Sequence, residues 1–159
     1  MTATYDLIAS NVLTSSAASV TFSSIPATYR DLVLVMNVTS TYALTTMRFN
    51  SDTGSNYTAV RMAGDGSSAS SGTQSTTFID CYIEASTGNR SMSIVQINDY
   101  SATDKHKPVL IRATSPHART VAIAARWANT SAINSITLNA FDTYQYEAGS
   151  SFHLYGIVA

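Results

Sequence analysis

Oxygen-bearing side chains gather in the segment NSDTG at residues 50–54, with a spacing similar to that of a calcium-binding loop. Carboxylate and amide oxygens are ligands that Ca²⁺ prefers. An EF-hand loop, however, has glycine at its sixth position and a closing glutamate, whereas glycine is fifth here and SNY follows. We therefore interpret the segment as a turn, in which Asp52 accepts hydrogen bonds from backbone N–H groups and Gly54 takes a positive φ.

The other acidic and nucleophilic residues indicate neither a phosphate site nor a hydrolase centre. The tripeptide Gly64-Asp65-Gly66 lacks the lysine and the helix of a phosphate loop, so we expect a tight hairpin end. Asp80 and Glu84 share one face of an expected strand but lie roughly 13 Å apart along it, beyond the separations used in glycoside hydrolysis. No G-x-S-x-G elbow occurs, and the three histidines sit in unrelated contexts. We expect no enzyme, no metal site and no cofactor.

Aromatic side chains raise the alternative of a sugar-binding site, because their faces stack on saccharide rings and jelly rolls often host lectins. Tyr144 and Tyr146 lie in the segment DTYQYEAG, which lacks an apolar alternation to bury them. We therefore expect both to be exposed contact residues. Trp127 ends an expected strand, where core packing is its commoner role, and the remaining tyrosines suit sheet cores and interfaces.

The charge pattern argues against nucleic acid and membranes as partners. The formal net charge is −1 at pH 7, and the nine lysines and arginines are scattered, so no basic field attracts nucleic acid or anionic lipid. We interpret the adjacent Lys105, His106 and Lys107 as a solvated loop. Cys81 has no partner for an intramolecular disulfide and is expected in the core. No apolar stretch reaches transmembrane length and the N-terminus lacks signal-peptide features, so we expect a soluble chain made in a cytoplasm.

Side chains that alternate with a period of two dominate the sequence and predict strands. The segment DLVLVMNVTS at residues 31–40 is apolar on both faces at its start, as expected for a central strand or for one side of an interface. Residues 121–128 are rich in alanine, but Val, Ile and Trp alternate there, which favours a strand. The expected strands cover residues 5–13, 19–22, 31–40, 47–50, 57–62, 76–84, 91–100, 108–113, 120–128, 133–140 and 152–157.

Turn chemistry separates these strands. Pro26 and Pro116 end strands because proline cannot donate to a ladder, and glycine-containing turns at residues 52–54, 64–66, 87–89 and 148–150 tolerate positive φ. Residues 25–30 form at most one helical turn, and the Ser-rich residues 66–75 are expected to form a loop. Short, regularly spaced strands with such punctuation predict one all-β domain over residues 1–159, an antiparallel β-sandwich of the jelly-roll type.

Three blocks of the sequence resemble a group of tailed-phage virion proteins. They are TYDLIASNVLTSSAASVTFSSIPATYRDLVL at residues 4–34, RFNSDTGSNYTAVRMAGDGSSASSG at residues 48–72, and INSITLNAFDTYQYEAGSSFHLYGI at residues 133–157. Together they cover about half of the chain in one order. The chain departs from the family pattern at Ser51, where glycine is common, and over residues 80–126.

The resemblance implies a compact β-sandwich on the virion surface, of the kind labelled tail fibre, head fibre or capsid decoration protein. The expected function is capsid decoration: a homotrimer binds the assembled major capsid protein on the outer surface of the shell and cements it across subunit boundaries. The alternative is a tail-fibre or receptor-binding module that recognises host surface glycan, for which Tyr144 and Tyr146 are the expected contacts.

Two segments are the expected contacts to the capsid or to a neighbouring subunit. One is the N-terminal arm and the other is the loop over residues 101–108. The residues that we assign to these contacts are Thr2, Thr4, Tyr5, Asp6, Lys105, His106 and Lys107.

Overall fold

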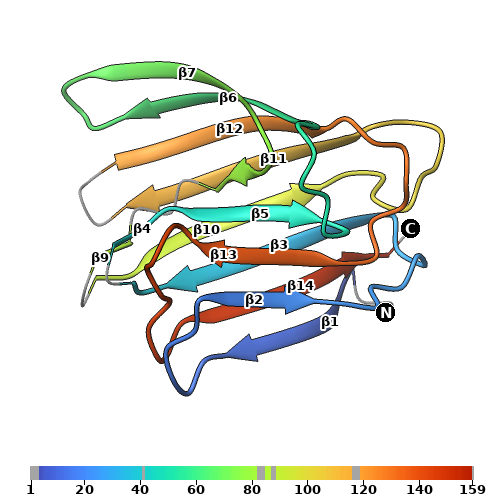
Figure 1. Ribbon diagram of the computed structural model, residues 1–159, viewed down its shortest axis with the longest axis horizontal. Coiled ribbons are helices and arrows are strands. Elements are labelled where there is room, and N and C mark those ends of the chain that lie inside the picture. The colour runs from blue at the N-terminus through green and yellow to red at the C-terminus, as the bar shows by residue number, and fades with distance from the viewer. Residues whose placement is uncertain (1–3, 41, 82–84, 87–88, 116–118, 159) are drawn as a thin grey trace.

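The alternating side chains form strands throughout the computed structural model, which describes residues 4–40, 42–81, 85–86, 89–115 and 119–158 (Figure 1). Within these ranges, no helix is long and apolar enough to span a membrane. The strands are β1 (Tyr5–Val12), β2 (Ser19–Phe22), β3 (Asp31–Val38), β4 (Tyr42–Ala43), β5 (Thr45–Phe49), β6 (Tyr57–Gly64), β7 (Ala69–Thr76), β8 (Ile79–Asp80), β9 (Ala85–Ser86), β10 (Ser91–Ile97), β11 (Lys107–Ser115), β12 (Arg119–Trp127), β13 (Ile136–Ala140) and β14 (Ser151–Ile157).

The strands form two facing sheets and one short ribbon. The eight-stranded sheet has the order β1-β14-β3-β10-β11-β12-β6-β7, the four-stranded sheet has the order β2-β13-β5-β8, and β4 pairs with β9. Every pair is antiparallel, and the first strand pairs with the last while the second pairs with the last but one. This nesting is that of a rolled-up hairpin. The expected antiparallel β-sandwich of the jelly-roll type is confirmed.

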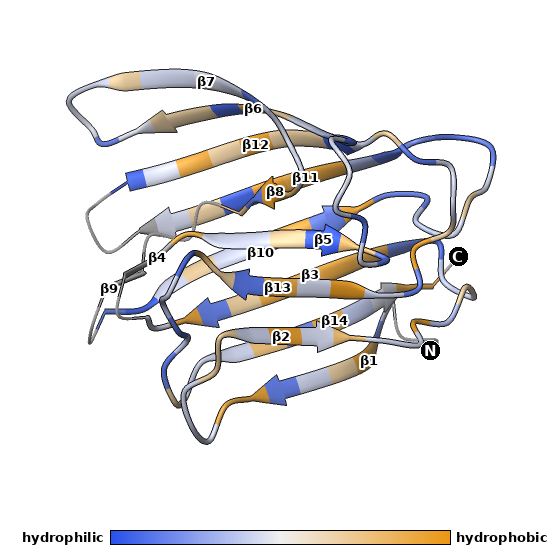
Figure 2. Ribbon diagram, viewed as in Figure 1, coloured by the Kyte–Doolittle hydropathy of each residue, from blue (hydrophilic) through white to orange (hydrophobic). Residues whose placement is uncertain are grey.

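The core lies between the two sheets. Leu32, Leu34 and Met36 of β3 are fully buried there, as are Phe49 of β5 and Leu138 of β13. Hydrophobic residues recur along the strands of both sheets (Figure 2). Because successive side chains of a strand point to opposite faces, the core uses only alternate residues of the large sheet and leaves the others on its far side.

The sequence-based predictions for two segments that follow β6 are wrong. The Ser-rich residues 66–75, expected as a loop, mostly belong to β7, because pairing with β6 needs backbone groups and not apolar side chains. The strand expected over residues 76–84 does not form as one element: β7 ends at Thr76 and β8 covers only Ile79–Asp80. The chain leaves the large sheet after Thr76 to reach the small one, and residues 82–84 lie outside the described ranges.

Two other strands are shorter than expected. β13 begins at Ile136 because the residues before it bond elsewhere; the N–H of Ile133 donates to the carbonyl of Tyr100 at 2.9 Å. β10 ends at Ile97, and Asp99 follows with a φ of 49°. Residues 25–30 form turns, so the helical turn allowed there is absent.

Candidate interaction surface

The segment of residues 50–54 is a turn whose carboxylate is fully engaged by N–H donors. Asp52 Oδ1 accepts from the N–H of Gly54 at 2.8 Å, and Oδ2 accepts from Asn56 Nδ2 at 2.8 Å and from Trp127 Nε1 at 2.7 Å. Burial acts to raise the pKa of Asp52, but these hydrogen bonds outweigh it and lower the pKa. Among the described residues, no group of three or more His, Cys, Asp and Glu could hold a metal ion. The backbone hydrogen bond to Asp52 that the turn interpretation expects is present.

The positive φ of this turn is not where the sequence predicts it. Asn50 and Ser51 have φ values of 51° and 56°, whereas Gly54 is not among the positive-φ residues. Gly54 instead provides room, because a Cβ there would lie 2.7 Å from Asn56 Nδ2. A residue with a side chain is strained at positive φ by about 1–2 kcal/mol, so Ser51 stores strain in the turn.

We expect the substitution Ser51→Gly to raise the free energy of unfolding by roughly 0.5–1 kcal/mol, since glycine relieves the strain at positive φ but loses more chain entropy on folding. Urea unfolding measures the change. Ser55→Gly is the matched control: Ser55 is an exposed residue of the same turn without a positive φ. The strain account is wrong if Ser51→Gly is no more stable than Ser55→Gly.

Asp65 caps the second turn, as the sequence predicts. Its Oδ1 accepts from the N–H of Ser68 at 2.7 Å and from that of Ser67 at 2.9 Å, and Gly66 has a φ of 87°. The backbone bonds from Ser68 and Ser67 lower the pKa of Asp65 well below its usual range. The tripeptide therefore closes the β6–β7 hairpin.

The remaining candidates for chemistry stay apart or lie in the core. Asp80 is half-buried in β8, and Glu84 lies outside the described ranges. His106 is exposed, and Nδ1 of His153 shares a hydrogen bond of 2.9 Å with the hydroxyl of Ser10. Cys81 is fully buried, and burial raises the pKa of its thiol, so its expected place in the core is confirmed.

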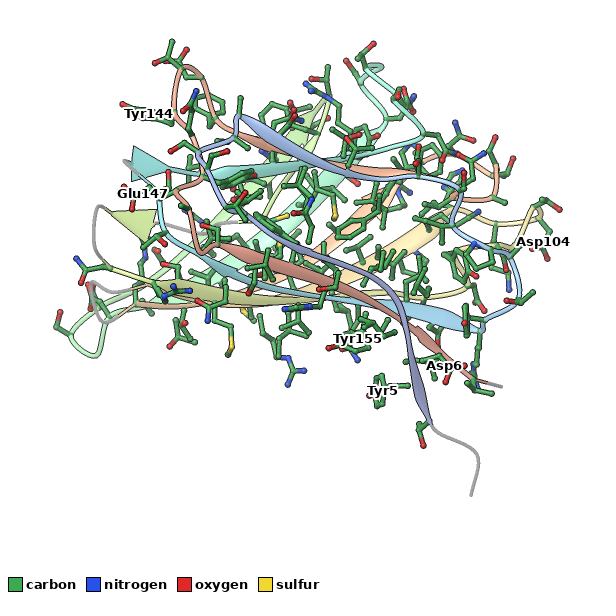
Figure 3. The ribbon with its side chains drawn as sticks, turned by 90° about the horizontal axis from the view of Figure 1, so that it is seen from below. Tyr5, Asp6, Asp104, Tyr144, Glu147 and Tyr155 are labelled. Carbon is green, nitrogen blue, oxygen red and sulfur yellow. The ribbon has the colours of Figure 1, made fainter. Side chains whose placement is uncertain are left out.

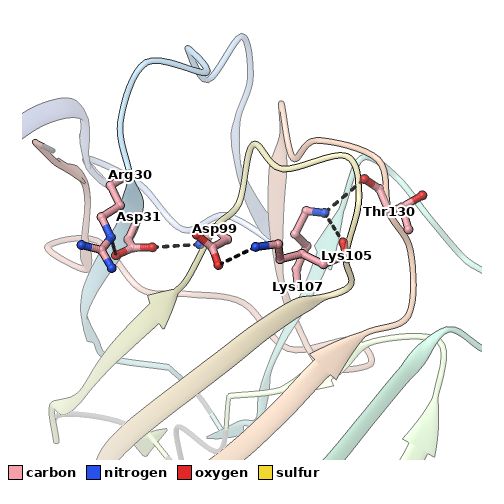
Figure 4. A network of polar contacts seen from close by, with 6 residues as sticks. All are labelled: Arg30, Asp31, Asp99, Lys105, Lys107 and Thr130. Atoms are coloured by element: carbon pink, nitrogen blue, oxygen red, sulfur yellow. Dashed lines mark hydrogen bonds and ion pairs between the residues drawn. The ribbon is translucent and has the colours of Figure 1, made fainter.

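Lys107 was expected in a solvated loop, and this expectation is wrong. Its side chain is fully buried at the start of β11, where Nζ donates to the carbonyl oxygens of Lys105 at 2.7 Å and of Thr130 at 3.2 Å (Figure 4). Burial lowers the pKa of Lys107. These two acceptors allow the ammonium group to be buried. Lys107 therefore holds residue 105 of its own loop next to residue 130, and its side chain is not available to contact the capsid or another subunit.

Lys105 and its surroundings form the exposed part of the same network. Lys105 Nζ lies 3.5 Å from Asp99 Oδ2, and the N–H of Asp99 donates to Asp31 Oδ1 at 2.8 Å. The side chains of Lys105 and Asp99 are about half exposed, so this ion pair adds little stability. Lys105 and His106 keep the exposure that a contact residue needs.

Tyr146 was expected to be exposed, but it is fully buried. Its ring packs edge-on against Phe152 at 5.0 Å, and its backbone N–H and C=O both bond to Ala17, at 2.9 and 3.0 Å. Tyr144 is half-buried against the core. The loop before β14 folds back onto the sandwich, so neither tyrosine is an open platform for a sugar.

Burial of tyrosine hydroxyls makes stability sensitive to alkaline pH. Burial raises the pKa of Tyr57 from 10.0 to about 12, and also raises the pKa values of Tyr146 and Tyr100. The stabilisation from Tyr57 is present below pH 10 and is lost as the pH rises through about 12, since the folded state holds the proton longer. Lys107 has the opposite effect on stability: burial lowers its pKa in the folded state, so its contribution becomes more favourable as the pH rises, up to its unfolded pKa of 10.5.

We therefore expect the free energy of unfolding to fall above pH 10, by about 2 kcal/mol from Tyr57 alone at pH 11.5. Urea unfolding at pH 8, 10.5 and 11.5 measures the loss. Tyr57→Phe is the control: it is less stable at pH 8 because the hydroxyl bonds to Phe49 disappear, but its pH dependence is shallower. Equal slopes for both proteins would contradict the assignment.

The structure brings most of the expected contact residues to one end of the sandwich. β1 begins at Tyr5, which pairs with Ile157 of β14, and Ile157 pairs with Asp31. Asp31 bonds to Asp99, so the loop of Lys105 lies at the same end. Thr4 and Tyr5 are exposed and Asp6 is half-buried, whereas Thr2 lies outside the described ranges. Tyr144 lies at the opposite end, far from Tyr5 and Asp6 (Figure 3).

The largest surface feature is the side of the eight-stranded sheet that faces away from the small sheet. Met62 is 64% exposed there, Val60 54% and Leu110 48%. Tyr5 and Tyr155 project from this side near its end (Figure 3). We call this surface the outer face and define it by its apolar and small members: Tyr5, Leu7, Val33, Val35, Val60, Met62, Ile94, Leu110, Ala122, Ala124 and Tyr155.

Two shallow depressions meet on the outer face at Arg112 and Gln96. One, of about 620 Å³, also includes Met62 and Leu110, and the other, of about 330 Å³, includes Tyr5 and Tyr155 among its lining residues. No acidic residue lines either depression. Within the described residues, Arg112 is exposed and has no ion-pair partner. The outer face therefore combines exposed apolar side chains with polar ones, and the positive charge of Arg112 lies near its centre; a second arginine, Arg126 of β12, lies on the same side.

Sequence reasoning missed most of the outer face, although one signal was present. The segment at residues 31–40 is apolar on both faces, and its strand β3 has neighbours on both sides in the large sheet. This confirms the expectation of a central strand. On β6 and β11 the outward apolar residues, Val60, Met62 and Leu110, alternate with buried ones, and alternation alone does not say which set is exposed.

No protein-family model matches the chain, and no curated protein matches its sequence. Among solved structures, the galectin LEC-6 of Caenorhabditis elegans is similar over 98% of this chain and 96% of its own, with 8% identity and a TM-score of 0.36. The alginate lyase Aly36B is similar over 93% and 77%, with 11% identity and a TM-score of 0.38. The chicken-liver agglutinin CG-16 is similar over 84% and 98%, with 8% identity and a TM-score of 0.27. At these scores the likenesses carry no inference about ligand or activity.

Proposed function

We propose that this chain is a structural protein of a bacteriophage virion that decorates the capsid, and that its outer face is the surface that contacts the major capsid protein. The resemblance of its three sequence blocks to tailed-phage virion proteins supports the class. The outer face is the observation that carries the mode of action, because it is a large surface suited to a protein partner.

The size of the outer face fits this role. Neighbouring strands lie about 4.8 Å apart and rise about 3.3 Å per residue, so eight strands of seven to nine residues cover roughly 1,000 Å². A stable protein–protein interface buries about 800 Å² on each partner, so the outer face is large enough for one. Val60 and Met62 of β6 and Leu110 of β11 lie on either side of β12 with large exposed fractions, and a covering partner would account for their exposure.

The charge on the outer face sets the chemistry of the partner. Arg112 lies between Ile94 of β10 and Ala122 of β12, in the middle of the sheet. An arginine buried under a partner without an acceptor costs several kcal/mol, so the capsid surface presents an Asp or Glu carboxylate there. Bidentate pairing of the guanidinium then fixes the orientation of the docked chain.

Decoration stabilises the shell by mass action. Contacts that exist only when capsid subunits are assembled favour the assembled state by an amount that grows with the concentration of bound chain. The outer surface of the capsid is the proposed location, and no catalytic step is part of the proposal. The homotrimer implied by the resemblance remains a prediction, since no described residue marks a threefold contact.

The number of copies in the virion tests this function. Quantitative mass spectrometry of purified particles of the encoding phage should give hundreds of copies, in a fixed ratio to the major capsid protein. Particles made without the chain should lose their DNA at a lower temperature, and adding the purified chain should restore the difference. A few tens of copies or fewer per particle would contradict decoration.

A receptor-binding module that recognises host glycan is the second candidate, and the depression beside Tyr5 and Tyr155 favours it. Aromatic rings next to Gln96 and Arg112 offer stacking together with hydrogen-bond donors, a combination that suits a saccharide. This candidate predicts that the isolated chain binds host cells or a glycan array and that Tyr5→Ala abolishes the binding. Decoration predicts no such binding.

A further inference from the structure

The free edge of β7 is a second surface that can join molecules. A strand at the edge of a sheet exposes a row of unpaired N–H and C=O groups, and proteins guard such edges with charges, proline, bulges or short length. β7 is the last strand of the large sheet and lies at its upper margin in Figure 1. Its sequence, ASSGTQST, contains neither a charged residue nor proline.

The other edges of the two main sheets are guarded, in contrast to β7. β1 contains a register shift between Leu7 and Ala9 and carries Asp6. β2 has four residues and β8 has two, which is too short for extended pairing. β7 has eight residues, and its register with β6 runs without a shift from Tyr57↔Thr76 to Gly64↔Ala69. Among the edge strands of the two main sheets in the described residues, β7 alone is long, regularly paired and without charged residues.

We propose that β7 pairs antiparallel with β7 of a second copy about a twofold axis, so that two eight-stranded sheets become one continuous sheet. An antiparallel pair of identical strands is self-complementary about a twofold axis. Residues that lie opposite one another in a strand pair point to the same face of the sheet. When both strands are β7, this condition requires one residue to lie opposite the same residue of the other copy. Gly72 and Thr73 are the two residues nearest the middle of the strand. The axis therefore passes beside one of these two.

Neutral side chains make either register acceptable. Ser71, Thr73 and Ser75 lie on the side of the outer face, and Ser70, Gly72, Gln74 and Thr76 lie on the other side. Like charges opposite one another destabilise a strand pair, whereas Thr and Ser pairs stabilise it. No like charges meet when β7 faces its own copy, so a second copy of this chain is the partner that the edge fits.

The pairing differs from a threefold assembly and is independent of docking on the capsid. It joins the outer faces of two molecules side by side and leaves Arg112 uncovered, because β11 is four strands away from β1 and three strands away from β7. The outer face thus stays free for the major capsid protein. The dimer does not require the proposed function, because it rests on the edge alone.

The double variant Ser71→Glu/Thr73→Glu tests the proposal in either register. If Gly72 faces its copy, Glu at 71 meets Glu at 73, and if Thr73 faces its copy, the two substituted residues at 73 meet. Ser19→Glu/Thr21→Glu is the matched control, since it adds the same charges at the same spacing to exposed positions of the short edge strand β2. All four substituted residues are exposed, so both variants should keep the fold, which the urea midpoint checks.

Sedimentation of the full chain should give twice the monomer mass of 17.0 kDa for the wild type and for the β2 variant, and 17.0 kDa for the β7 variant. Amide exchange should be slow along residues 69–76 in the wild type and fast in the β7 variant. The proposal is overturned by a wild type that stays monomeric at every concentration, by a β7 variant that still associates, or by equal loss of association in both variants.

Discussion

Replacing Asp52 with alanine is expected to lower the free energy of unfolding by about 2–3 kcal/mol, because its carboxylate accepts a hydrogen bond from a buried indole, and a bond to a charged acceptor contributes about that much. Trp127 is 1% exposed, and its Nε1 lies 2.7 Å from Asp52 Oδ2. The buried indole N–H therefore loses the acceptor that it has in the folded protein. The indole ring packs on Phe49 and Tyr57, so the disturbance reaches the core.

Trp127 itself reports the effect, since it is the one tryptophan of the chain. Urea unfolding followed by its fluorescence should show a lower midpoint for Asp52→Ala together with a native emission shifted to the red. Asp65→Ala is the control: Asp65 also caps a turn, but its oxygens bond only to exposed serines and their backbone. Equal losses for the two variants would show that the bond to Trp127 contributes nothing beyond turn capping.

Placing an acid at the centre of the outer face is expected to remove capsid binding. Leu110 is 48% exposed, between Gln96 of β10 and Ala124 of β12. A glutamate at 110 would lie on the same side of β11 as Arg112 and would occupy the guanidinium that the capsid carboxylate is proposed to bind. The capsid carboxylate would then be left unpaired at a cost of about 2–5 kcal/mol, so Leu110→Glu should weaken binding to particles made without the chain by roughly 30-fold or more. The fold should tolerate the change, since exposed substitutions usually alter stability by about 0.5 kcal/mol or less.

Phe141→Glu is the control for this result. Phe141 is 44% exposed, close to the value for Leu110, but it follows β13 in the small sheet and is not part of the outer face. Binding measured by cosedimentation with the particles should be unchanged for Phe141→Glu and lost for Leu110→Glu. Full binding by Leu110→Glu, or equal weakening by both variants, would place the contact elsewhere on the molecule.

The sequence predicted the sandwich because period-two alternation and turn residues are local signals. β3, β10 and β12 pack on the core with alternate residues, and Asp65 and Gly66 close the hairpin where the turn chemistry placed it. β7 escaped prediction because ASSGTQST lacks apolar alternation; its strand depends on the backbone of β6, a partner that the residues of β7 themselves do not reveal.

The misplaced site residues have a common physical cause: their burial is decided by distant segments. Lys107 is buried because its Nζ donates hydrogen bonds to two carbonyl oxygens, that of Lys105 and that of Thr130 in a different loop. Tyr146 is buried because its backbone pairs with Ala17 near the other end of the chain. The residues next to Lys107 and Tyr146 in the sequence do not indicate either contact.

The outer face could be predicted only in part. Alternation divides the residues of a strand into two sets, but the choice of the buried set depends on where the second sheet lies. Because the small sheet covers one side of the large sheet, Leu110 and Met62 face water while Val109 and Ala63 are buried. The apolar character of β3 on both sides was the one local sign that the uncovered side of the sheet also carries apolar residues.

Imaging the intact virion at a resolution that separates strands would show which face of this chain meets the capsid. We expect density for this chain on the outer surface of the capsid, with the eight-stranded sheet turned toward the shell and an acidic side chain of the major capsid protein beside Arg112. Density in which the outer face points to solvent, or density for this chain only on the tail, would contradict this expectation.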